Sequence, residues 1–445
     1  MKRTILFAAL LCYFLNAEAQ TLQSQLIADM IDSAQGIVSH DFNNDGNIEF
    51  VVTQFSQDRV ILLTENNGQY EERELLSLDG PIRVGVGDFN LDGRDDILVI
   101  SQTQAGIRIL KNNGDLDFSL QTINVFDFER GRSFVLEDLD NDGDLDLVIA
   151  SPIRDRISLF EMTSPDFFSY EVTDIDTNLD NVGEVSLGDF DGDGDSDILA
   201  VARFGGNVNI YLNSDGEFNT FLPIDSKPSP VGSTTGDYNN DGMVDFAITD
   251  FLGAVLLYIN EGNNIFNELQ IDVDIPESTS IESFDFDLDG DLDLAVVFED
   301  GLAIFENTDP QELTFMRDDF FVEGGLSDIH IFDYKNDGDL DIAASSASLD
   351  AVFVFENDIL SSTFTIRQDS DIKVYPNPAV NEINIEVSDD RKYITKLFSL
   401  DGQLINHDVN TLKINVQSLP AQTYILEITE TTSGERRFEK LMIGN

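Results

Sequence analysis

Seven short acidic phrases hold the residues of this chain that are best suited to chemistry. The phrase DLDNDGDLD at residues 138–146 places Asp at its first, third, fifth and ninth positions and Gly at its sixth. Carboxylates at this density repel one another unless a cation holds them, and Ca²⁺ takes roughly six to eight oxygen ligands at about 2.3–2.6 Å. Alternate side chains of a tight loop converge on one point, and glycine permits the positive φ of a sharp turn. The phrase is therefore typical of a calcium-binding loop.

Closely similar phrases occur seven times, with starting points 47 to 51 residues apart, and we number them loops 1 to 7 in chain order. A fixed repeat period indicates a repeat architecture. The backbone carbonyl of position 7 can add a further ligand. The predicted side-chain ligands are Asp41, Asn43, Asp45 and Glu49 in loop 1; Asp88, Asn90, Asp92 and Asp96 in loop 2; Asp138, Asp140, Asp142 and Asp146 in loop 3; Asp189, Asp191, Asp193 and Asp197 in loop 4; Asp237, Asn239, Asp241 and Asp245 in loop 5; Asp285, Asp287, Asp289 and Asp293 in loop 6; and Asp333, Asp337 and Asp341 in loop 7.

The seven loops differ in the negative charge that they offer to a cation. Loops 3, 4 and 6 carry Asp at all four ligand positions, whereas loops 1, 2 and 5 carry Asn at the third. Loop 7 has Lys335 at that position, so we expect its site to be weak or empty. The alternative is that Asp, Asn and Gly are simply good turn formers. Turns alone, however, do not require acidic residues at four alternating positions.

The segments around each phrase predict four short β-strands per repeat. In the third repeat, SFVLE at 133–137 precedes the loop and LVIA at 147–150 follows it, and two further strand-like stretches come before the next phrase. Seven such sheets bury both of their faces when they are arranged radially. We therefore predict an all-β fold, a seven-bladed β-propeller. Residues 22–30 resemble an additional outer strand, so one end of the chain is expected to close the ring, and the sequence does not show which.

Two resemblances cover most of the chain. Over about residues 30–365 the repeats resemble the FG-GAP/VCBS family, which also occurs in integrin α-chains and whose calcium sites stabilise the blades. The segments KVYPNPAVNEINIEV at 373–387 and LPAQTYILEI at 419–428 resemble the type A sorting domain of the type IX secretion system of Bacteroidetes. Their alternating pattern predicts a small Ig-like β-sandwich. This second resemblance implies handling by the type IX secretion machinery, export across the outer membrane, and removal of the tail before release or surface attachment.

The first residues of the chain predict a signal peptide. A basic start and an apolar stretch precede Ala17 and Ala19, which form a small-x-small cleavage site. Cys12 could instead mark a lipoprotein, but the Leu before it is larger than such a site prefers. No later segment approaches 18 uninterrupted apolar residues, so no membrane span is expected. The predicted domains are 1–19 (signal peptide), 20–368 (propeller) and 369–445 (sorting domain), and the predicted location is secreted or on the outer cell surface.

The charge of the chain bears on its partners. A net charge of −60, from 85 acidic and 25 basic residues, argues against nucleic acid as a ligand. If the acidic loops join the first and second strands of each blade, the opposite face carries seven arginines: Arg59, Arg83, Arg130, Arg132, Arg154, Arg156 and Arg203. Arg forks suit carboxylate and sulfate groups, so we hypothesise an anionic polysaccharide ligand, with Arg130, Arg132, Arg154, Arg156 and Arg203 as contacts. The alternative is local pairing with neighbouring carboxylates.

Evidence for catalysis in the sequence is limited to one pair of residues. His330 and Glu282 each lie three residues before an acidic loop, so they occupy the same inner-strand position in neighbouring blades. Such a pair can perform acid–base chemistry, but it also suits a purely structural hydrogen bond. We therefore predict a calcium-binding propeller that acts as a binding or adhesion module. The alternatives are a polysaccharide-degrading lyase or hydrolase, and a scaffold for protein partners.

Overall fold

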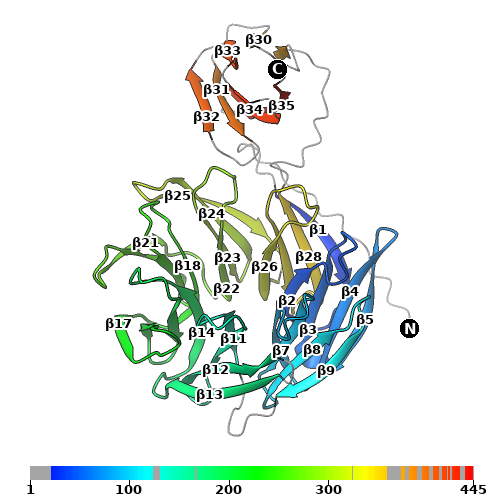
Figure 1. The fold of residues 1–445 in the computed structure, drawn as a ribbon, viewed down its shortest axis with the longest axis vertical. Coiled ribbons are helices and arrows are strands. Elements are labelled where there is room, and N and C mark those ends of the chain that lie inside the picture. Colours follow the sequence, from blue (N-terminus) through cyan, green and yellow to red (C-terminus); the bar gives the residue numbers. More distant parts are fainter. Residues whose placement is uncertain are drawn as a thin grey trace. The chain divides into compact units, whose positions relative to one another are not determined.

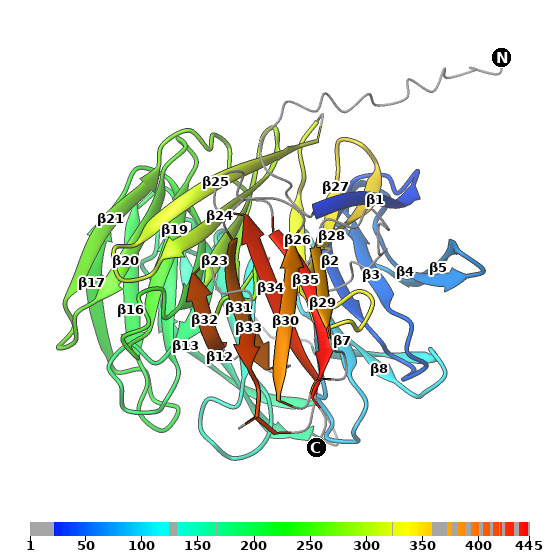
Figure 2. The same cartoon turned by 90° about the horizontal axis from the view of Figure 1, so that it is seen from above.

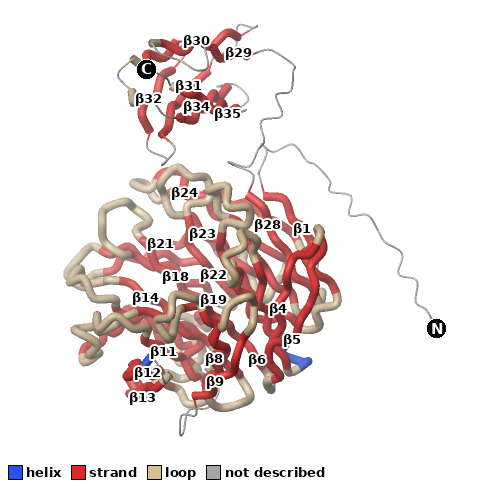
Figure 3. Tube along the Cα trace, turned by 45° about the vertical axis from the view of Figure 1, so that its right-hand side comes forward, coloured by secondary structure: helices blue, strands red, loops and turns tan. Residues whose placement is uncertain are grey.

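The computed structural model describes residues 22–357 apart from 124–130, 166–167 and 323, together with segments between 372 and 443. The expected signal peptide at 1–19 and Arg130 lie outside the described residues. By its internal contacts the chain divides into two compact units, one of them Leu22–Ser361, and Ser362–Asn445 belongs to the other. Figure 1 shows the strands of the first unit as a ring of radial sheets. Figure 3 shows that strands and loops make up nearly all of its described residues, and a short 3₁₀ helix lies at Phe55–Gln57.

The first unit contains seven four-stranded antiparallel sheets, which are the seven predicted blades. Blade 1 has β2 (Ala34–His40), β3 (Glu49–Gln54), β4 (Arg59–Asn66) and β5 (Gln69–Ser77); blade 2 has β6 (Pro81–Gly87), β7 (Asp96–Ser101), β8 (Ile107–Asn112) and β9 (Phe118–Ile123); blade 3 has β10 (Ser133–Glu137), β11 (Asp146–Ser151), β12 (Arg156–Ser164) and β13 (Ser169–Asp176); blade 4 has β14 (Val182–Gly188), β15 (Asp197–Ala202), β16 (Asn207–Leu212) and β17 (Thr220–Ser226). Blade 5 has β18 (Pro230–Gly236), β19 (Asp245–Asp250), β20 (Val255–Asn260) and β21 (Phe266–Asp272); blade 6 has β22 (Ser280–Phe284), β23 (Asp293–Phe298), β24 (Gly301–Asp309) and β25 (Thr314–Phe321). The fourth strands lie at the rim, as β17, β21 and β25 do in Figure 2.

The N-terminal strand closes the ring. Blade 7 consists of β26 (Asp328–Phe332), β27 (Asp341–Ser346), β28 (Ala351–Asn357) and, as its outer strand, β1 (Leu22–Asp29). β1 runs antiparallel to β28, with Leu22 opposite Asn357 and Asp29 opposite Ala351. The outer-strand pattern at residues 22–30 therefore belongs to the last blade, which answers the question that the sequence left open.

The core lies between neighbouring blades. The second strand of each blade is buried along its whole length, because both of its faces are covered by adjacent blades. One cluster joins Val148 and Ala150 of β11 to Val185, Ile198 and Ala200 of blade 4. Complete burial of an aliphatic side chain contributes about 1.5–3 kcal/mol. This arrangement explains why the second strands are continuous apolar runs, whereas exposed sheets alternate apolar and polar residues.

The second unit is a small β-sandwich, as predicted. One sheet contains β29 (Ile372–Tyr375), β30 (Glu382–Val387) and β33 (Lys413–Asn415); the other contains β31 (Tyr393–Ser399), β32 (Leu404–Val409), β34 (Thr423–Glu430) and β35 (Arg436–Met442), in the order β32-β31-β34-β35. Ile383 and Ile385 of the first sheet share a core with Leu397, Leu426 and Leu441 of the second. Among the described residues, no helix has the length and hydropathy needed to cross a membrane.

Candidate functional site

Each acidic loop connects the first and second strands of its blade, as the sequence analysis assumed. In loop 4 the carboxylate of Asp189 accepts the backbone N–H groups of Asp193 and Gly194, at 3.1 and 3.0 Å. The first Asp of the other six loops accepts the N–H groups of positions 5 and 6 in the same way. The glycine at position 6 has φ +100° in loop 4, and a Cβ there would meet nothing within 4 Å. The glycine is therefore required by backbone conformation rather than by space.

The acidic residue at position 9 is buried at the start of the second strand. In loop 4, Asp197 Oδ2 accepts the N–H of Phe190 at 2.9 Å, and Oδ1 accepts the N–H of Asn213 on the third strand at 2.7 Å. Burial raises the pKa of Asp197 to about 6. Burial raises the position-9 pKa to about 7 for Glu49, to about 8 for Asp293, and to about 6 for Asp96, Asp146, Asp245 and Asp341. A carboxylate at position 9 therefore gains from a nearby cation.

The carboxylates converge in the loops that carry Asp at all four ligand positions. The three groups whose ligand oxygens all lie within 4.8 Å of one another are Asp138, Asp140 and Asp146 in loop 3; Asp189, Asp191 and Asp197 in loop 4; and Asp285, Asp287 and Asp289 in loop 6. Two ligands on opposite sides of a calcium ion are separated by about twice the bond length, roughly 4.6–5.2 Å. The donor set is entirely oxygen, which suits a hard cation. These three loops could hold a metal ion, and their spacing fits calcium.

Loops 2 and 7 bring a lysine of the chain into or beside the turn. In loop 2, Lys111 Nζ lies 3.1 Å from both Asn90 Oδ1 and Asp92 Oδ2. Arg94 also pairs with Asp92 Oδ2, at 2.7 Å. In loop 7, Lys335 Nζ lies 2.5 Å from Glu356 on β28. In loop 2 the chain therefore supplies positive charge where the all-Asp loops present only carboxylates.

An asparagine at the end of the third strand ties a loop to the next blade, which the sequence analysis did not recognise. Asn213 Nδ2 of blade 4 donates to the carbonyl of Leu139 in loop 3 at 2.9 Å and to Ser196 O of its own blade at 3.1 Å. The same bond to the second residue of the preceding loop is made by Asn112, Asn260, Asn307 and Asn357. The repeated Asn in KNNG, LNSDG and FENDI was the available signal. Strand register places Met162 and Glu65 at this position in blades 3 and 1.

Most of the predicted arginines on the opposite face have protein partners. Arg59 pairs with Glu72 at 2.7 Å, and Arg156 pairs with Asp174 at 2.9 Å. Arg154 also has an interaction partner. Arg203 lies over the ring of Phe251, 4.2 Å from its centroid, and donates from Nε to Ser229 Oγ at 3.0 Å.

Two arginines lie near the axis of the ring instead. Arg83 belongs to β6 and lines an axial cavity, where it forms ion pairs with Asp328 and Glu184. Arg132 immediately precedes β10, and within the described part of the chain its guanidinium has no hydrogen bond or ion pair. Of the arginines proposed from the sequence, Arg132 and Arg203 are therefore the two that remain without a carboxylate partner among the described residues.

Exposed apolar side chains adjoin these arginines. The loops between the second and third strands of blades 3, 4 and 5 present Ile153, Phe204 and Leu252, with 47, 72 and 68% of their surfaces exposed. Phe204 directly follows Arg203, and Leu252 directly follows Phe251. The sequence analysis missed these residues because a single apolar residue in a short loop has no periodic signal. Together, Arg203, Phe204, Phe251 and Leu252 form what we call the blade 4–5 platform.

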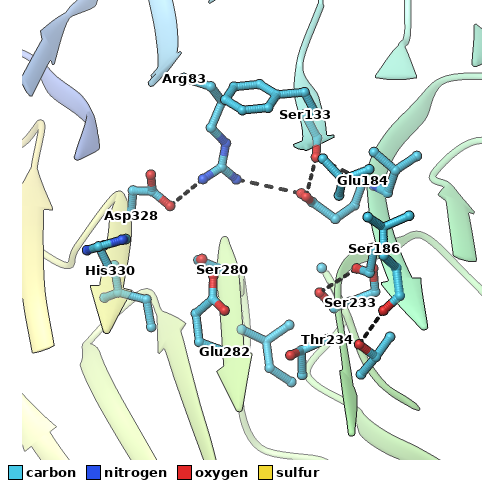
Figure 4. Close-up of a pocket in the computed structure, with 18 of the residues that line it drawn as sticks. Arg83, Ser133, Glu184, Ser186, Ser233, Thr234, Ser280, Glu282, Asp328 and His330 are labelled. Atoms are coloured by element: carbon cyan, nitrogen blue, oxygen red, sulfur yellow. Dashed lines mark hydrogen bonds and ion pairs between the residues drawn. The ribbon is translucent and has the colours of Figure 1, made fainter. Parts of the chain in front are cut away.

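His330 and Glu282 both line the axial cavity, as their equivalent strand positions predicted (Figure 4). His330 Nδ1, however, is 2.8 Å from Ser39 Oγ, and burial lowers its pKa to about 4. Burial, together with the charge of Asp328, raises the pKa of Glu282 to about 8. The structure gives no hydrogen bond between His330 and Glu282 in the described part of the chain, and the other histidine of the propeller region, His40, pairs with Asp95 at 2.8 Å.

Comparison with known proteins identifies both units. A family model described as an FG-GAP-like repeat matches residues 41–99, 88–149, 138–200, 189–248 and 237–296, more than half of the chain. A model described as a secretion system C-terminal sorting domain matches residues 373–444. No curated protein sequence matches the chain.

Solved structures with the same fold share little sequence with this chain. PorZ, described as an essential bacterial surface component of the type IX secretion system of Porphyromonas gingivalis, matches with a TM-score of 0.51 and 11% identity over 92% of this chain and 61% of its own. The extracellular domain of the putative hybrid two component system BT4673 from B. thetaiotaomicron matches with a TM-score of 0.51 and 10% identity over 96% of this chain and 60% of its own. This chain thus spans about three fifths of the length of these structures, and at such identity the likeness concerns the fold alone.

The repeat matches begin at the first Asp of each of loops 1 to 5, so the family model and the acidic loops describe the same units. The sorting-domain match covers the strands of the β-sandwich. Such a domain indicates secretion to the cell surface or the exterior through the type IX system. The chain is a member of the FG-GAP-like repeat family, a seven-bladed β-propeller that ends in a type IX secretion sorting domain.

Proposed function

We propose that this protein is a calcium-stabilised binding module of the cell surface, and that the face opposite its acidic loops binds an anionic polysaccharide. The observation that carries the proposal is the blade 4–5 platform beside Arg132. In a chain of net charge −60, cationic side chains without carboxylate partners are conspicuous. Here two of them accompany exposed aromatic and aliphatic surface. Acidic sugars offer both groups that such a surface recognises, a carboxylate or sulfate for arginine and a C–H face for the ring.

Calcium would act as the structural staple of this module. Cys12 is the single cysteine of the chain and lies in the proposed signal peptide 1–19, so the exported protein would have no disulfide. A ligand that binds the folded state stabilises it by mass action, by about 2.7 kcal/mol when its concentration is a hundredfold above Kd. Loops 3, 4 and 6 would bind calcium most strongly because their carboxylates converge. Loops 1 and 5 would bind it less strongly, because they carry an amide at position 3. Loops 2 and 7 would bind it weakly or not at all, because a lysine lies in or beside the turn.

The route to the surface follows from the two ends of the sequence. We propose that the signal peptide 1–19 directs export from the cytoplasm and that the type IX machinery carries the folded propeller 20–368 outward. The sorting domain 369–445 would then be removed, leaving the propeller released or surface-attached. The likeness to PorZ supports a surface setting for this architecture without assigning its role to this chain.

Affinity electrophoresis tests the proposed ligand. The full chain is run through native gels cast with polygalacturonate, with a sulfated polysaccharide, or with neutral dextran, in the presence of calcium. We expect retardation by the acidic polymers and none by dextran. Arg203→Ala should raise the apparent Kd obtained from the retardation at least fivefold, because it removes the cation stacked on Phe251. Arg73→Ala, which removes the same charge from β5 at the rim, is the matched control and should behave as the parent protein.

Two outcomes would contradict the polysaccharide proposal. Absence of retardation by every polymer, with the protein folded, would exclude it. Equal losses of affinity for Arg203→Ala and Arg73→Ala would show that the effect depends only on net charge.

The exposure of Phe204 and Leu252 specifically favours a second candidate, a protein partner, because large exposed apolar side chains grouped on one face commonly mark protein interfaces. Capture of surface proteins by the parent chain, and not by Phe204→Asp, would support this candidate. Appearance of new reducing ends or unsaturated products would instead indicate a degrading enzyme.

A further inference from the structure

The axis of the propeller contains a polar cavity that the proposed binding face does not use. Its volume is about 330 Å³, and residues of all seven inner strands line it (Figure 4). Small-molecule sites in proteins commonly measure about 300–1,000 Å³, so this cavity is large enough for one small ligand. Its polar lining includes hydroxyl groups from several blades, among them Ser133, Ser186, Ser233 and Ser280.

One side of the cavity satisfies its own charges. Arg83 reaches from blade 2 to Asp328 of blade 7, and its second terminal nitrogen lies 3.6 Å from Glu184 of blade 4. The hydroxyl of Ser133 in blade 3 donates to the same Glu184 carboxylate. Between blades 4 and 5, the hydroxyls of Ser186 and Ser233 are hydrogen-bonded at 2.6 Å. These groups hold the wall of the cavity in place and have little capacity left for a ligand.

The wall formed by blades 6 and 7 retains hydrogen-bonding groups without partners. Glu282 points into the cavity, and no hydrogen bond or ion pair reaches its carboxyl among the described residues (Figure 4). The hydroxyl of Ser280 on the same strand likewise has no partner in the described part of the chain. His330 Nδ1 accepts the backbone N–H of Ser39 at 3.4 Å, so its proton is on Nε2, which is left to donate. With its raised pKa, Glu282 keeps a proton near neutral pH and can both donate and accept.

A cation without a hydrogen-bonded or ion-paired partner among the described residues lies beside residues that line the same cavity. Arg132 directly precedes Ser133, and its Nε and Cδ lie 3.6 and 3.7 Å from the Cβ position of Gly183, next to Glu184. Burial lowers the pKa of Arg132, and the charges of Arg83 and Arg203 lower it further, against the effect of Glu184. Arg83 pairs with Asp328 and Glu184, and Arg132 has no hydrogen bond or ion pair from its guanidinium among the described residues, so that guanidinium has donors available for a ligand carboxylate.

We propose that the axial cavity binds one terminal sugar acid, a monosaccharide-sized polyhydroxylated carboxylate, with its carboxylate on Arg132 and its hydroxyls on Glu282, Ser280 and His330. The proposal rests on the proposed function, because it assigns the end of an acidic glycan to the cavity and the rest of the chain to the blade 4–5 platform. Neutral hydrogen-bonding groups on one wall and a lone guanidinium at the other edge match the two ends of such a ligand. A neutral sugar would leave Arg132 without a partner, and a simple anion would leave Glu282 without one.

Calorimetric titration of the full chain in calcium separates these requirements. The probes are galacturonate and glucuronate, with galactose as the uncharged analogue and acetate as the charge without hydroxyls. We expect at least one of the two sugar acids to bind at least tenfold more tightly than galactose and acetate. Arg132→Gln and Glu282→Ala should each weaken binding tenfold or more. Glu282→Gln should recover most of the loss, because an amide also donates and accepts, and Arg73→Ala should bind as the parent.

A second measurement distinguishes recognition of chain ends from recognition of the polymer. Equal masses of long and short polygalacturonate are compared in the gel, and binding to ends predicts stronger retardation by the short chains. If retardation depends on mass alone, persists in Arg132→Gln and falls in Arg203→Ala, the cavity proposal is wrong while the proposed function stands. If both sugar acids bind the parent and Arg132→Gln equally, or neither binds, the cavity proposal is also wrong. If the sugar acids bind and their binding requires Arg132, but no polymer retards the protein, the cavity proposal stands and the polysaccharide proposal is wrong.

Discussion

Loops 2 and 4 share one backbone frame but differ in whether basic side chains of the chain reach their carboxylates. The first Asp accepts the N–H groups of positions 5 and 6 in both, at 3.0 and 2.7 Å for Asp88 and at 3.1 and 3.0 Å for Asp189. In loop 4, the carboxylates of Asp189, Asp191 and Asp197 converge, with one oxygen of each within 4.8 Å of the others. In loop 2, Lys111 and Arg94 reach Asp92. The turn itself therefore does not depend on a basic side chain, and what differs between the two loops is whether the chain itself supplies positive charge to the carboxylates.

The difference extends to the interface with the next blade. Loops 1, 3, 4, 5 and 6 each have their second carbonyl bound by an asparagine of the following blade. For loops 2 and 7, strand register places Met162 and Glu65 there, neither of which has a side-chain N–H. These are also the two loops that have a lysine in or beside the turn. Loops 1, 3, 4, 5 and 6 thus receive a hydrogen bond from an asparagine of the following blade, whereas loops 2 and 7 lack this bond among the described residues and have a lysine in or beside the turn.

Removal of calcium should have the largest effect. If loops 3, 4 and 6 each bind calcium, saturation at a hundredfold excess over Kd stabilises the fold by about 2.7 kcal/mol per loop, so chelation should lower the Tm of the propeller by several degrees or more. Differential scanning calorimetry with excess calcium and with chelator measures this. Magnesium at the same concentration is the control, since it accommodates this flexible oxygen cage less well. An unchanged Tm would mean that all seven loops are metal-free turns.

The pH dependence should separate the metal-free from the calcium-bound protein. Burial raises the pKa of the position-9 carboxyls, for example that of Asp197 from 3.8 to about 6. A raised pKa contributes stability below about pH 4 that is lost as the pH rises through 6. The metal-stripped protein should therefore lose the stability that Asp197 contributes between about pH 4 and 6, and for Glu49 the loss extends to about pH 7.

Calcium should reverse this trend. Its ligands must be deprotonated, so calcium binding strengthens as the pH rises over the same range. We expect the Tm difference between the calcium-loaded and metal-stripped proteins to widen from pH 5 to pH 7. A difference that stays constant would show that the position-9 carboxyls are not linked to calcium. His330 contributes equally to the pH dependence of both samples. Its lowered pKa removes stability as the pH falls from about 6.5 to 4, with or without calcium, so it leaves the Tm difference between the samples unchanged.

Exchange of the charges in loops 2 and 4 tests the comparison directly. Asp191→Ala removes one of the converging carboxylates of loop 4, so it should lower the Tm in calcium but change it little in chelator. Asn90→Ala at the same position of loop 2 removes hydrogen bonds to Lys111 and Asp96, and should lower the Tm equally in both buffers. The same calorimetric scans give all four values. Equal calcium dependence of the two variants would contradict the distinction between the loops.

The reverse change should make loop 2 resemble loop 4. The double variant Arg94→Gln/Lys111→Gln removes both cations from Asp92, leaving the loop with Asp88, Asp92, Asp96 and the Asn90 amide. We expect calcium titration to detect one additional site and the Tm to become more dependent on calcium. Arg73→Ala is again the control for a simple change in net charge.

Much of this architecture is encoded locally and could be predicted. The spacing of the Asp and Gly residues predicted the loops, and their period predicted seven blades. Loops 3, 4 and 6, which carry the most carboxylates in the sequence, are also those in which three carboxylates converge among the described residues. The pattern at residues 22–30 predicted an additional outer strand, but it could not show which strand β1 pairs with, because that partner lies more than 300 positions away. Lys111 was missed for the same reason, because it reaches loop 2 from the third strand of the blade. Arg83 was predicted to lie on the binding face, because its ion pair with Asp328 joins blades 2 and 7 and cannot be read from the sequence.

The smallest effect that we predict comes from removing one of the asparagine side chains that hydrogen-bond to the acidic loop of the preceding blade. Asn213→Ala leaves the buried carbonyls of Leu139 and Ser196 without their side-chain donor. An unsatisfied buried acceptor costs about 1–3 kcal/mol, which in a propeller of this size is a shift of a few degrees in Tm. Asn219→Ala is the matched control, because that asparagine is exposed six residues later in the same blade. Chemical denaturation of the two variants in calcium compares them.

The calcium dependence of Asn213→Ala indicates what the tie does. The N–H of Leu139 is held by Asp146, a predicted ligand of loop 3, and its C=O is held by Asn213 of blade 4. If the tie orients loop 3 for its cation, Asn213→Ala should weaken calcium binding at loop 3 in addition to loosening the interface, and the Tm gap between calcium and chelator should shrink. If the loss of Tm is the same in both buffers, the tie serves only the joint between blades. In that case the absence of an asparagine partner for loop 2 would follow from the packing of Met162 between the blades. It would not follow from the presence of Lys111 and Arg94 beside that loop.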